Sequence, residues 1–395
     1  MARARRPNHV VTPMLACQRD AFDLPRDVCY LNAAAWGPLP RAVQEAGRAA
    51  VARKGQPWTL AGDFPASQHD RARRAAAALI GAEPRDVALI SSVGYGVAIA
   101  GKVMAIPRGA RVLVLQNDHT SPVLEWMGRA EAQGFTLDTV AQPADQDWTT
   151  AVLAAIARPG APPLALASIS SVHWSDGGAL DLARIGAALK KAGAAFLIDA
   201  THDVGVRHID VATLDPDFLI FPTYKWVLGP YGRAFAYVAR RRQDGVPLEQ
   251  TAFARRGVSA EDSVYFRDTR YHDDARRYDM GERDHFVSLE MAALGMEMMA
   301  SWGQPEIEAR LAMLTGRLAE GLGNLGLAIP DARHRAPHIL SVGFPRSMPA
   351  DFPQRLAAAK VYAAPRLGRL RISPHVYNDE ADIERFVEVF RAALS

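Results

Sequence analysis

Short apolar runs alternate with amphipathic stretches along most of this chain. Apolar runs bounded by turn residues predict buried strands. The chain has seven such runs, which start at Ala88, Val112, Thr136, Leu164, Ala194, Phe218 and Ala234. Amphipathic stretches predict helices at residues 41–54, 66–80, 152–157 and 182–191, and one that ends near Met104. Strands that alternate with helices predict an α/β fold with a doubly wound, mostly parallel sheet of seven strands.

A second pattern follows the basic stretch at residues 240–245. Residues 250–278 are polar, rich in Arg and Tyr and without a firm period, so we expect them to pack against a partner subunit. Beyond them, the periodicity predicts helices at 286–302, 304–322 and 380–394 and strands at 338–343 and 370–372. We therefore expect three parts: an N-terminal arm (1–29), a large domain (30–280) and a smaller C-terminal α/β domain (281–395).

Two of the predicted strands end near side chains that can carry chemistry. Asp199 follows the apolar run 194–198, His202 comes three residues later, and Lys225 follows the run 218–221. In an open α/β sheet, the carboxyl ends of the strands form the ligand crevice. There, a lysine amine can form a Schiff base with pyridoxal phosphate, and an aspartate can keep the pyridine nitrogen protonated. Taken alone, the pair also fits a surface lysine and a helix-capping aspartate.

Composition narrows the class of protein. The 395 residues can bury a large core, and 49% hydrophobic and 23% charged residues are ordinary for a soluble protein. A net charge of +3 gives no reason to expect a nucleic-acid partner, and no apolar run is long enough to cross a membrane. Cys17 and Cys29 provide neither a disulfide framework nor a metal-ligand spacing, so we expect no metal and a cytoplasmic location.

The segments around the aspartate and the lysine resemble a known family. Asp199-Ala200-Thr201-His202 and Thr223-Tyr224-Lys225-Trp226…Gly229-Pro230-Tyr231-Gly232 are similar to motifs of the class V aminotransferases. These fold-type I enzymes include cysteine desulfurases, isopenicillin N epimerase and kynureninase, and the resemblance extends from about Tyr30 to the C-terminus. It implies a pyridoxal 5'-phosphate cofactor, a seven-stranded large domain, an amino acid substrate and a homodimer with shared active sites.

The resemblance assigns roles around the cofactor ring. Lys225 would form the Schiff base and move the α-proton, and Asp199 would hold the pyridinium. His202 stands where many members have a glutamine that reaches the ring hydroxyl, and kynureninases have histidine. His119, in the run Asp118-His119-Thr120-Ser121, would stack on the ring and could shuttle a proton.

Three further segments are candidates for cofactor contacts, chiefly to its phosphate. When a glycine-containing turn joins a strand to a helix, the backbone N–H groups at the start of the helix can face an anion. Here that turn carries Ser92, Val93, Gly94 and Tyr95. Family members often have Thr or Ser in place of Gly94. The resemblance also implies that Thr223 and Tyr224 contact the cofactor. It implies that Arg283 reaches across the dimer interface to the cofactor phosphate of the other subunit.

The substrate contacts come from three places. Arg371, in a segment that resembles the family's C-terminal signature, would bind the α-carboxylate, which suits the fork of a guanidinium. The small-residue loop at 30–40 contains Asn32, Ala34 and Trp36 and is either a close approach to substrate or a simple strand-to-helix turn. Trp174 is expected where relatives often place an asparagine near the ring.

The reaction is the least determined feature. Desulfurases carry a cysteine shortly before the arginine signature, but residues 357–367 have none. We therefore do not expect persulfide transfer. The runs Tyr224-Lys225-Trp226…Gly229-Pro230-Tyr231-Gly232 and Met280-Gly281-Glu282-Arg283 resemble members described as class V aminotransferases or as isopenicillin-N-epimerase-like proteins. This resemblance implies transamination of a small amino acid through an external aldimine. A C–S or β-lyase, an amino acid epimerase and a kynureninase-like hydrolase, the last favoured by His202 and Tyr224, remain alternatives. A catalytically idle binding protein is a further hypothesis, against which the intact Lys225, Asp199 and Arg371 argue.

Overall fold

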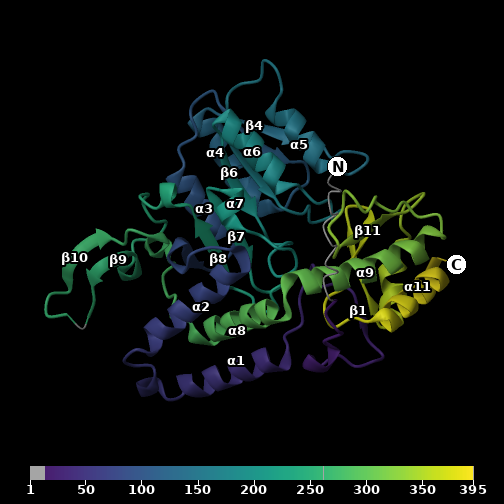
Figure 1. The fold of residues 1–395 in the computed structure, drawn as a ribbon, viewed down its shortest axis with the longest axis horizontal. Helices are drawn as coiled ribbons and strands as arrows, with labels where there is room; N and C mark the ends of the chain where they lie inside the picture. Colours follow the sequence, from purple (N-terminus) through teal and green to yellow (C-terminus); the bar gives the residue numbers. More distant parts are fainter. Residues whose placement is uncertain (1–13, 261, 395) are drawn as a thin grey trace, which may run out of the picture.

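The computed structural model describes residues 14–260 and 262–394, and its centre is a seven-stranded sheet (Figure 1). The strands lie in the order β2 (Val87–Ile90), β8 (Ala234–Val238), β7 (Phe218–Pro222), β6 (Ala195–Asp199), β5 (Leu164–Ser170), β3 (Arg111–Leu115) and β4 (Thr136–Val140). In this sheet, β8 runs opposite to the other six strands, which all point the same way. The predicted mostly parallel sheet is confirmed, and each predicted strand start is within one residue of the observed one.

Helices cover both faces of the sheet, which explains why its strands are apolar throughout. Along β3, Leu113 and Leu115 belong to one hydrophobic core, while Val112 and Val114 belong to the other. The first core includes residues of α2 (Phe64–Ile80), α5 (Trp148–Ile156), α6 (Leu182–Ala192) and α8 (Phe286–Trp302). The second includes residues of α3 (Val93–Val103) and α4 (Thr120–Gln133). The short α7 (Val211–Leu214) precedes β7.

A second, smaller unit follows α8 (Figure 1). Its antiparallel sheet contains β11 (Leu340–Gly343), β14 (Arg369–Ile372) and β13 (Ala364–Arg366). Its helices are α9 (Gln304–Gly323), α10 (Phe352–Ala358) and α11 (Glu380–Leu394). The chain therefore has the fold that the resemblance implies, a seven-stranded domain followed by a smaller C-terminal α/β unit.

The described part of the N-terminal arm joins this smaller unit. The short strand β1 (Cys29–Tyr30) pairs in parallel with β12 (Val361–Tyr362), and buried Arg19 forms a 2.8 Å ion pair with Asp382. The chain then enters α1 (Arg41–Lys54), which packs beside α8. The first thirteen residues of the expected arm lie outside the described residues. The expected boundaries at residues 29 and 280 stay predictions.

Some elements were not expected from the sequence. Residues 250–278, for which no regular structure was predicted, contain a hairpin of β9 (Arg255–Val258) and β10 (Phe266–Tyr271). Its strands carry charged residues among the others, so apolar alternation is absent, and it extends away from the sheet (Figure 1). The helix expected at 152–157 begins earlier, at Trp148, because the Asp147 side chain caps it by accepting from Thr150 N.

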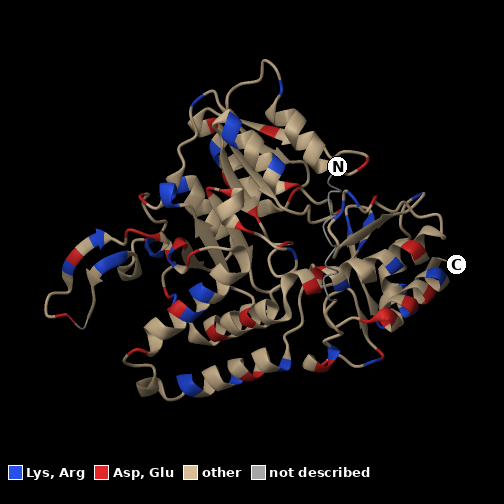
Figure 2. Cartoon of the chain, in the orientation of Figure 1, with Lys and Arg blue, Asp and Glu red and all other residues tan. Residues whose placement is uncertain are grey.

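Charge is distributed without a dominant sign. Lys and Arg are interspersed with Asp and Glu over most elements (Figure 2). In the described part of the chain, no helix is both long and apolar enough to cross a membrane.

Candidate active site

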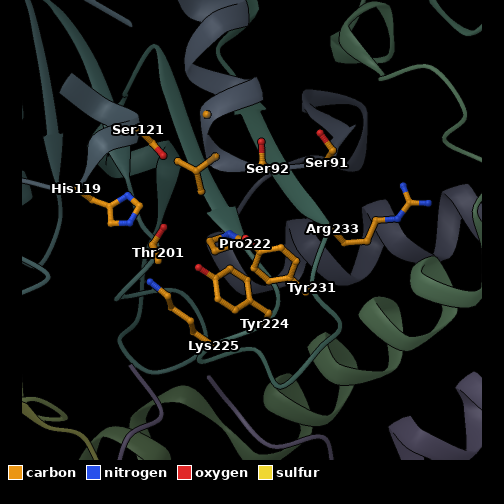
Figure 3. A pocket seen from close by; sticks show the side chains of 13 residues that line it. Ser91, Ser92, His119, Ser121, Thr201, Pro222, Tyr224, Lys225, Tyr231 and Arg233 are labelled. Atoms are coloured by element: carbon orange, nitrogen blue, oxygen red, sulfur yellow. The ribbon is translucent and has the colours of Figure 1, made fainter. Parts of the chain in front are cut away.

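A cavity of about 230 Å³ opens at the carboxyl ends of β6 and β7, where α3 and α4 begin (Figure 3). It is lined by Ser91, Ser92, Val93, Gly94, His119, Ser121, Thr201, Pro222, Tyr224, Lys225, Tyr231, Gly232 and Arg233. This edge of an α/β sheet is the usual place for ligands. Segments far apart in sequence thus meet at the place where strand-end chemistry was expected.

Lys225 and His202 are in direct contact beside the cavity. Lys225 Nζ lies 3.2 Å from His202 Nε2, and both side chains are buried. The indole N–H of Trp226 donates to His202 Nδ1 over 3.0 Å. An indole nitrogen only donates, so Nδ1 carries no proton, and a neutral His202 has its N–H at Nε2. This N–H is directed toward the lysine amine.

The surroundings of Lys225 favour its uncharged form. Burial lowers the pKa of Lys225 to about 7, the charge of Arg371 acts in the same direction, and Asp199 opposes it. Burial, followed by the charge of Lys225, holds the pKa of His202 well below its ordinary value. A buried lysine in this state is a nucleophile near neutral pH.

Asp199 is a buried carboxylate at the end of β6. Its Oδ1 accepts hydrogen bonds from the backbone N of Thr201, over 3.0 Å, and from the Thr201 hydroxyl. Its charge acts on both Lys225 and His119, so it lies near both. Within residues 14–260 and 262–394, no lysine, arginine or histidine forms an ion pair with it. A protonated pyridine nitrogen fits such a carboxylate.

His119 lines the cavity on another side, directly before α4 (Figure 3). Its ring meets the Trp174 ring edge-to-face at a centroid distance of 6.1 Å. The indole N–H of Trp174 donates to Asn117 O over 2.7 Å, which holds the tryptophan in place. Burial lowers the pKa of His119, so the neutral imidazole is favoured. A neutral, flat ring suits stacking on a cofactor ring.

The amino ends of α3 and α4 form one end of the cavity. Ser92 is the N-cap of α3, and its Oγ accepts from Tyr95 N over 3.1 Å. A Cβ at Gly94 would lie 3.9 Å from the Oγ atoms of both Ser92 and Ser121. Helix amino ends and hydroxyl groups bind anions, so this end fits the cofactor phosphate. The Ser121 hydroxyl therefore lies beside the position where family members often carry Thr or Ser, and its contact with the phosphate stays a prediction.

Arg371 of β14 is a buried cation without an acidic partner. It is 1% exposed, and its Nη1 donates to Trp174 O over 2.6 Å. In the described parts of the chain its Nε has no hydrogen-bond partner, and no carboxylate lies within ion-pair distance. Burial, with the charge of Arg366, lowers the pKa of Arg371 to about 9. Because an unpaired buried charge is costly, this guanidinium fits an anionic ligand.

The loop at residues 31–37 is tied to the strand that carries Arg371. Ser373 N donates to Leu31 O over 2.8 Å, and Ala34 N donates to Ser373 Oγ over 3.0 Å. The backbone of Asn32 forms an isolated parallel β-bridge with Ser373. The buried side-chain Oδ1 of Asn32 accepts no hydrogen bond from any described residue. The orphaned Oδ1 favours a close approach to substrate over a simple turn, and its ligand stays a prediction.

The far end of this loop contacts the lysine segment. Gly37 N donates to Tyr224 O over 2.9 Å, and a Cβ at Gly37 would lie 2.1 Å from Lys225 O. Only glycine allows this approach. The neighbouring Trp36 is 55% exposed and stacks on Tyr231 with a centroid distance of 5.0 Å. The two rings therefore stand beside the entrance to the cavity.

Five predicted cofactor residues do not line the cavity: Asp199 and His202, which lie close to Lys225, and the three described next. The Thr223 hydroxyl donates to Pro230 O over 2.7 Å, which gives it a role in the turn after Lys225. The Arg283 guanidinium pairs with Asp279 and lies 4.5 Å from the centre of the Phe253 ring. The half-buried Tyr95 lies beside Glu249, and burial raises the pKa of its hydroxyl. A role for any of these in cofactor binding stays a prediction.

Conversely, five polar or aromatic lining residues were not among the predicted site residues, namely Ser91, Ser121, Thr201, Tyr231 and Arg233. Ser121, Thr201 and Tyr231 stand in the segments that carry the resemblance, so their position was the available signal. Arg233 had no such signal in the sequence. In the structure its Nε donates to Ser288 Oγ over 2.8 Å, and burial lowers its pKa to about 10.

Known proteins share this architecture. The family model for Aminotransferase class-V matches residues 29–386. The "Uncharacterized aminotransferase YcbU" of Bacillus subtilis is 25% identical over 368 residues, 90% of either chain. A "Probable cysteine desulfurase" of Pyrococcus abyssi is 24% identical over 82% of either chain. The structure of a cysteine desulfurase from Thermococcus onnurineus superposes with a TM-score of 0.81 at 20% identity, covering 96% of this chain and 99% of that one.

Proposed function

We propose, from the premise that this chain belongs to the class V aminotransferase family, that it transfers the amino group of a small amino acid to a keto acid. As a member, it is a pyridoxal 5'-phosphate enzyme. The observation that carries the proposal is the grouping of a lysine with a lowered pKa, an unpaired carboxylate and an unpaired guanidinium. Lys225 suits the aldehyde of the cofactor, Asp199 suits its pyridinium, and Arg371 suits the carboxylate of an amino acid.

When bound, the cofactor supplies an electron sink for the α-carbon of the substrate. Asp199 would hold the pyridine nitrogen protonated, and the Ser92 and Ser121 hydroxyls with the helix amino ends would hold the phosphate. Arg371 would orient the α-carboxylate and so fix how the α-carbon is presented to the cofactor and to Lys225. Holding the substrate at two points is a large part of such catalysis.

Lys225 would also move the α-proton. Its Nζ can accept a proton because burial lowers its pKa to about 7, which leaves about half of the amine neutral at pH 7. His202 Nε2, at 3.2 Å, can donate to a ring hydroxyl or to Nζ itself. A buried neutral histidine does not compete with the lysine for the proton.

The choice of transamination rests on two supports. YcbU, similar over 90% of both chains, bears the name of an aminotransferase. Residues 357–367 contain no cysteine, while Cys17 and Cys29 lie on the arm, where their thiols donate to Tyr377 O and Asp382 O. Persulfide transfer would need a thiol in the site.

The test is a half-reaction on the purified holoenzyme. A panel of single amino acids is added without any keto acid while the visible absorbance of the cofactor is recorded. Transamination converts the cofactor to its pyridoxamine form, and a keto acid restores the original band. Lys225→Ala is the control, and it is expected to lack the lysine-bound band at the start.

Other products would replace this proposal. Pyruvate and ammonia, released while the band recovers, would establish a β-lyase; an inverted amino acid would establish an epimerase. Release of alanine from kynurenine would establish the hydrolase. No change with any amino acid would favour the binding protein.

A further inference from the structure

A second arginine stands next to the carboxylate-binding Arg371. In the register of β13 and β14, Ala364 lies opposite Arg371 and Arg366 lies opposite Arg369. Cross-strand partners and residues two apart point to the same face of a sheet. Arg366 and Arg371 therefore project from one face, on neighbouring strands.

The two arginines share the same tryptophan. The Arg366 guanidinium carbon lies 5.9 Å from the centre of the Trp174 ring, and the Trp174 carbonyl accepts from Arg371 Nη1 over 2.6 Å. Trp174 in turn meets His119, which lines the cavity. The charge of Arg366 is felt at Arg371 and at Lys225. Arg366 thus belongs to the substrate side of the site.

Arg366 has no anionic partner either. It is half-buried, and burial lowers its pKa. Its one hydrogen bond to another described residue runs from Nη1 to Pro365 O over 2.7 Å, and no described carboxylate lies within ion-pair distance. Arg369, on the same face, differs, because it donates to the carbonyl and hydroxyl of Ser341. The Arg366 fork is left available to a ligand.

We propose that Arg366 binds a second acidic group on the substrate, so that the enzyme acts on dicarboxylic amino acids. The inference rests on the proposed function in one respect, the binding of the α-carboxylate by Arg371. Two unpaired guanidinium groups match two carboxylates, and each can donate a pair of parallel hydrogen bonds. Among the described residues, Asp199 forms no ion pair with either arginine, and under the proposed function it would be occupied by the pyridinium.

The test compares acids with their amides, which have nearly the same shape but lack the charge. The half-reaction is measured with L-aspartate against L-asparagine and with L-glutamate against L-glutamine, for wild type, Arg366→Gln and Arg346→Gln. Arg346, an exposed arginine after β11, is the matched control. We expect wild type and Arg346→Gln to prefer an acid in kcat/KM, and Arg366→Gln to lose about 10- to 100-fold on the acid while the amides change little.

A second measurement is independent of turnover. Binding of succinate and of butyrate to the holoenzyme is measured by calorimetry, since these acids have equal carbon counts and differ in one carboxylate. We expect succinate to bind at least about tenfold tighter to wild type, and this advantage to vanish in Arg366→Gln.

Equal affinity for the two acids in wild type, or an equal loss for acids and amides in Arg366→Gln, would overturn the dicarboxylate assignment. A failure of the proposed function looks different: succinate would still depend on Arg366, but no amino acid would produce the pyridoxamine form.

Discussion

Burial decides the chemistry of Lys225 more than any single neighbour does. Loss of water around the ammonium is the largest influence on its pKa, and it brings the pKa to about 7. Asp199, although of opposite charge, acts more weakly than burial and Arg371. The amine is thus prepared for attack on an aldehyde before any ligand enters.

This environment predicts how the apoprotein recovers its cofactor. Only the neutral amine attacks, so the second-order rate with pyridoxal phosphate should rise about tenfold per pH unit below pH 7 and level off above it. Stopped-flow absorbance from pH 5.5 to 9 measures the profile. A rate that keeps rising to pH 9, as for an ordinary lysine, would contradict the lowered pKa.

At Arg371 we expect a loss of substrate binding without a loss of cofactor. Arg371→Met removes a charged contact of about 2–3 kcal/mol, so KM for the preferred amino acid should rise about 30- to 150-fold. Steady-state kinetics and the visible spectrum provide the two readouts. Arg371→Lys keeps the charge but not the forked guanidinium, so its KM should lie between those of wild type and Arg371→Met. An unchanged KM would remove the carboxylate role.

At the scale of elements, the site is the meeting point of strand exits, helix starts and one loop. The ends of β6 and β7 deliver Asp199 and Lys225, and the starts of α3 and α4 deliver the phosphate end. The loop at residues 31–37 connects this large-domain edge to β14 of the smaller unit. Its close packing on the lysine segment is therefore a requirement of the site.

Gly37→Ala tests that requirement. The new Cβ would lie 2.1 Å from Lys225 O, so the loop or the lysine segment must move, at a cost of about 1–3 kcal/mol. We expect a lower Tm and weaker cofactor retention, measured by calorimetry and by dialysis.

Gly316→Ala is the matched control. Gly316 lies inside α9, and no described atom apart from its chain neighbours and the helix's own backbone lies within 4 Å of its Cβ position. Alanine there should stabilise the protein by a few tenths of a kcal/mol to about 1 kcal/mol. If the two variants behaved alike, the approach of Gly37 to Lys225 would not be needed.

At the scale of the molecule, the β9–β10 hairpin stands out because it lacks a core. Near its tip, Val264, Tyr265 and Phe266 are 60%, 50% and 66% exposed. The hairpin extends from the body (Figure 1), and apolar side chains grouped on an extension favour contact with another protein. We propose that this contact belongs to a homodimer, as the resemblance implies.

The double variant Tyr265→Ser, Phe266→Ser tests the dimer. We expect light scattering to give the mass of a dimer for wild type and a shift toward monomer for the variant, because the apolar contact is lost. Met127→Ser, which removes an exposed apolar side chain of α4, is the control and should stay dimeric. A monomeric wild type, or a fully dimeric hairpin variant, would contradict the role of the hairpin.

The sequence by itself determined the sheet and the two residues on which the cofactor depends. Apolar runs leave little choice of element, and strand exits share one edge, so Asp199 and Lys225 could be placed together before any coordinates. The resemblance added His202, His119 and Arg371. The hairpin escaped prediction because charged residues interrupt its alternation.

Only the tertiary structure decided which of these side chains face the cavity and which are paired elsewhere. It turned the Thr223 hydroxyl to Pro230 and Arg283 to Asp279, and it brought Ser121 next to Gly94. It also left Arg366 unpaired beside Arg371. A sequence states which groups exist, but partners and burial depend on contacts between segments far apart in the chain, and those contacts exist only in the folded protein.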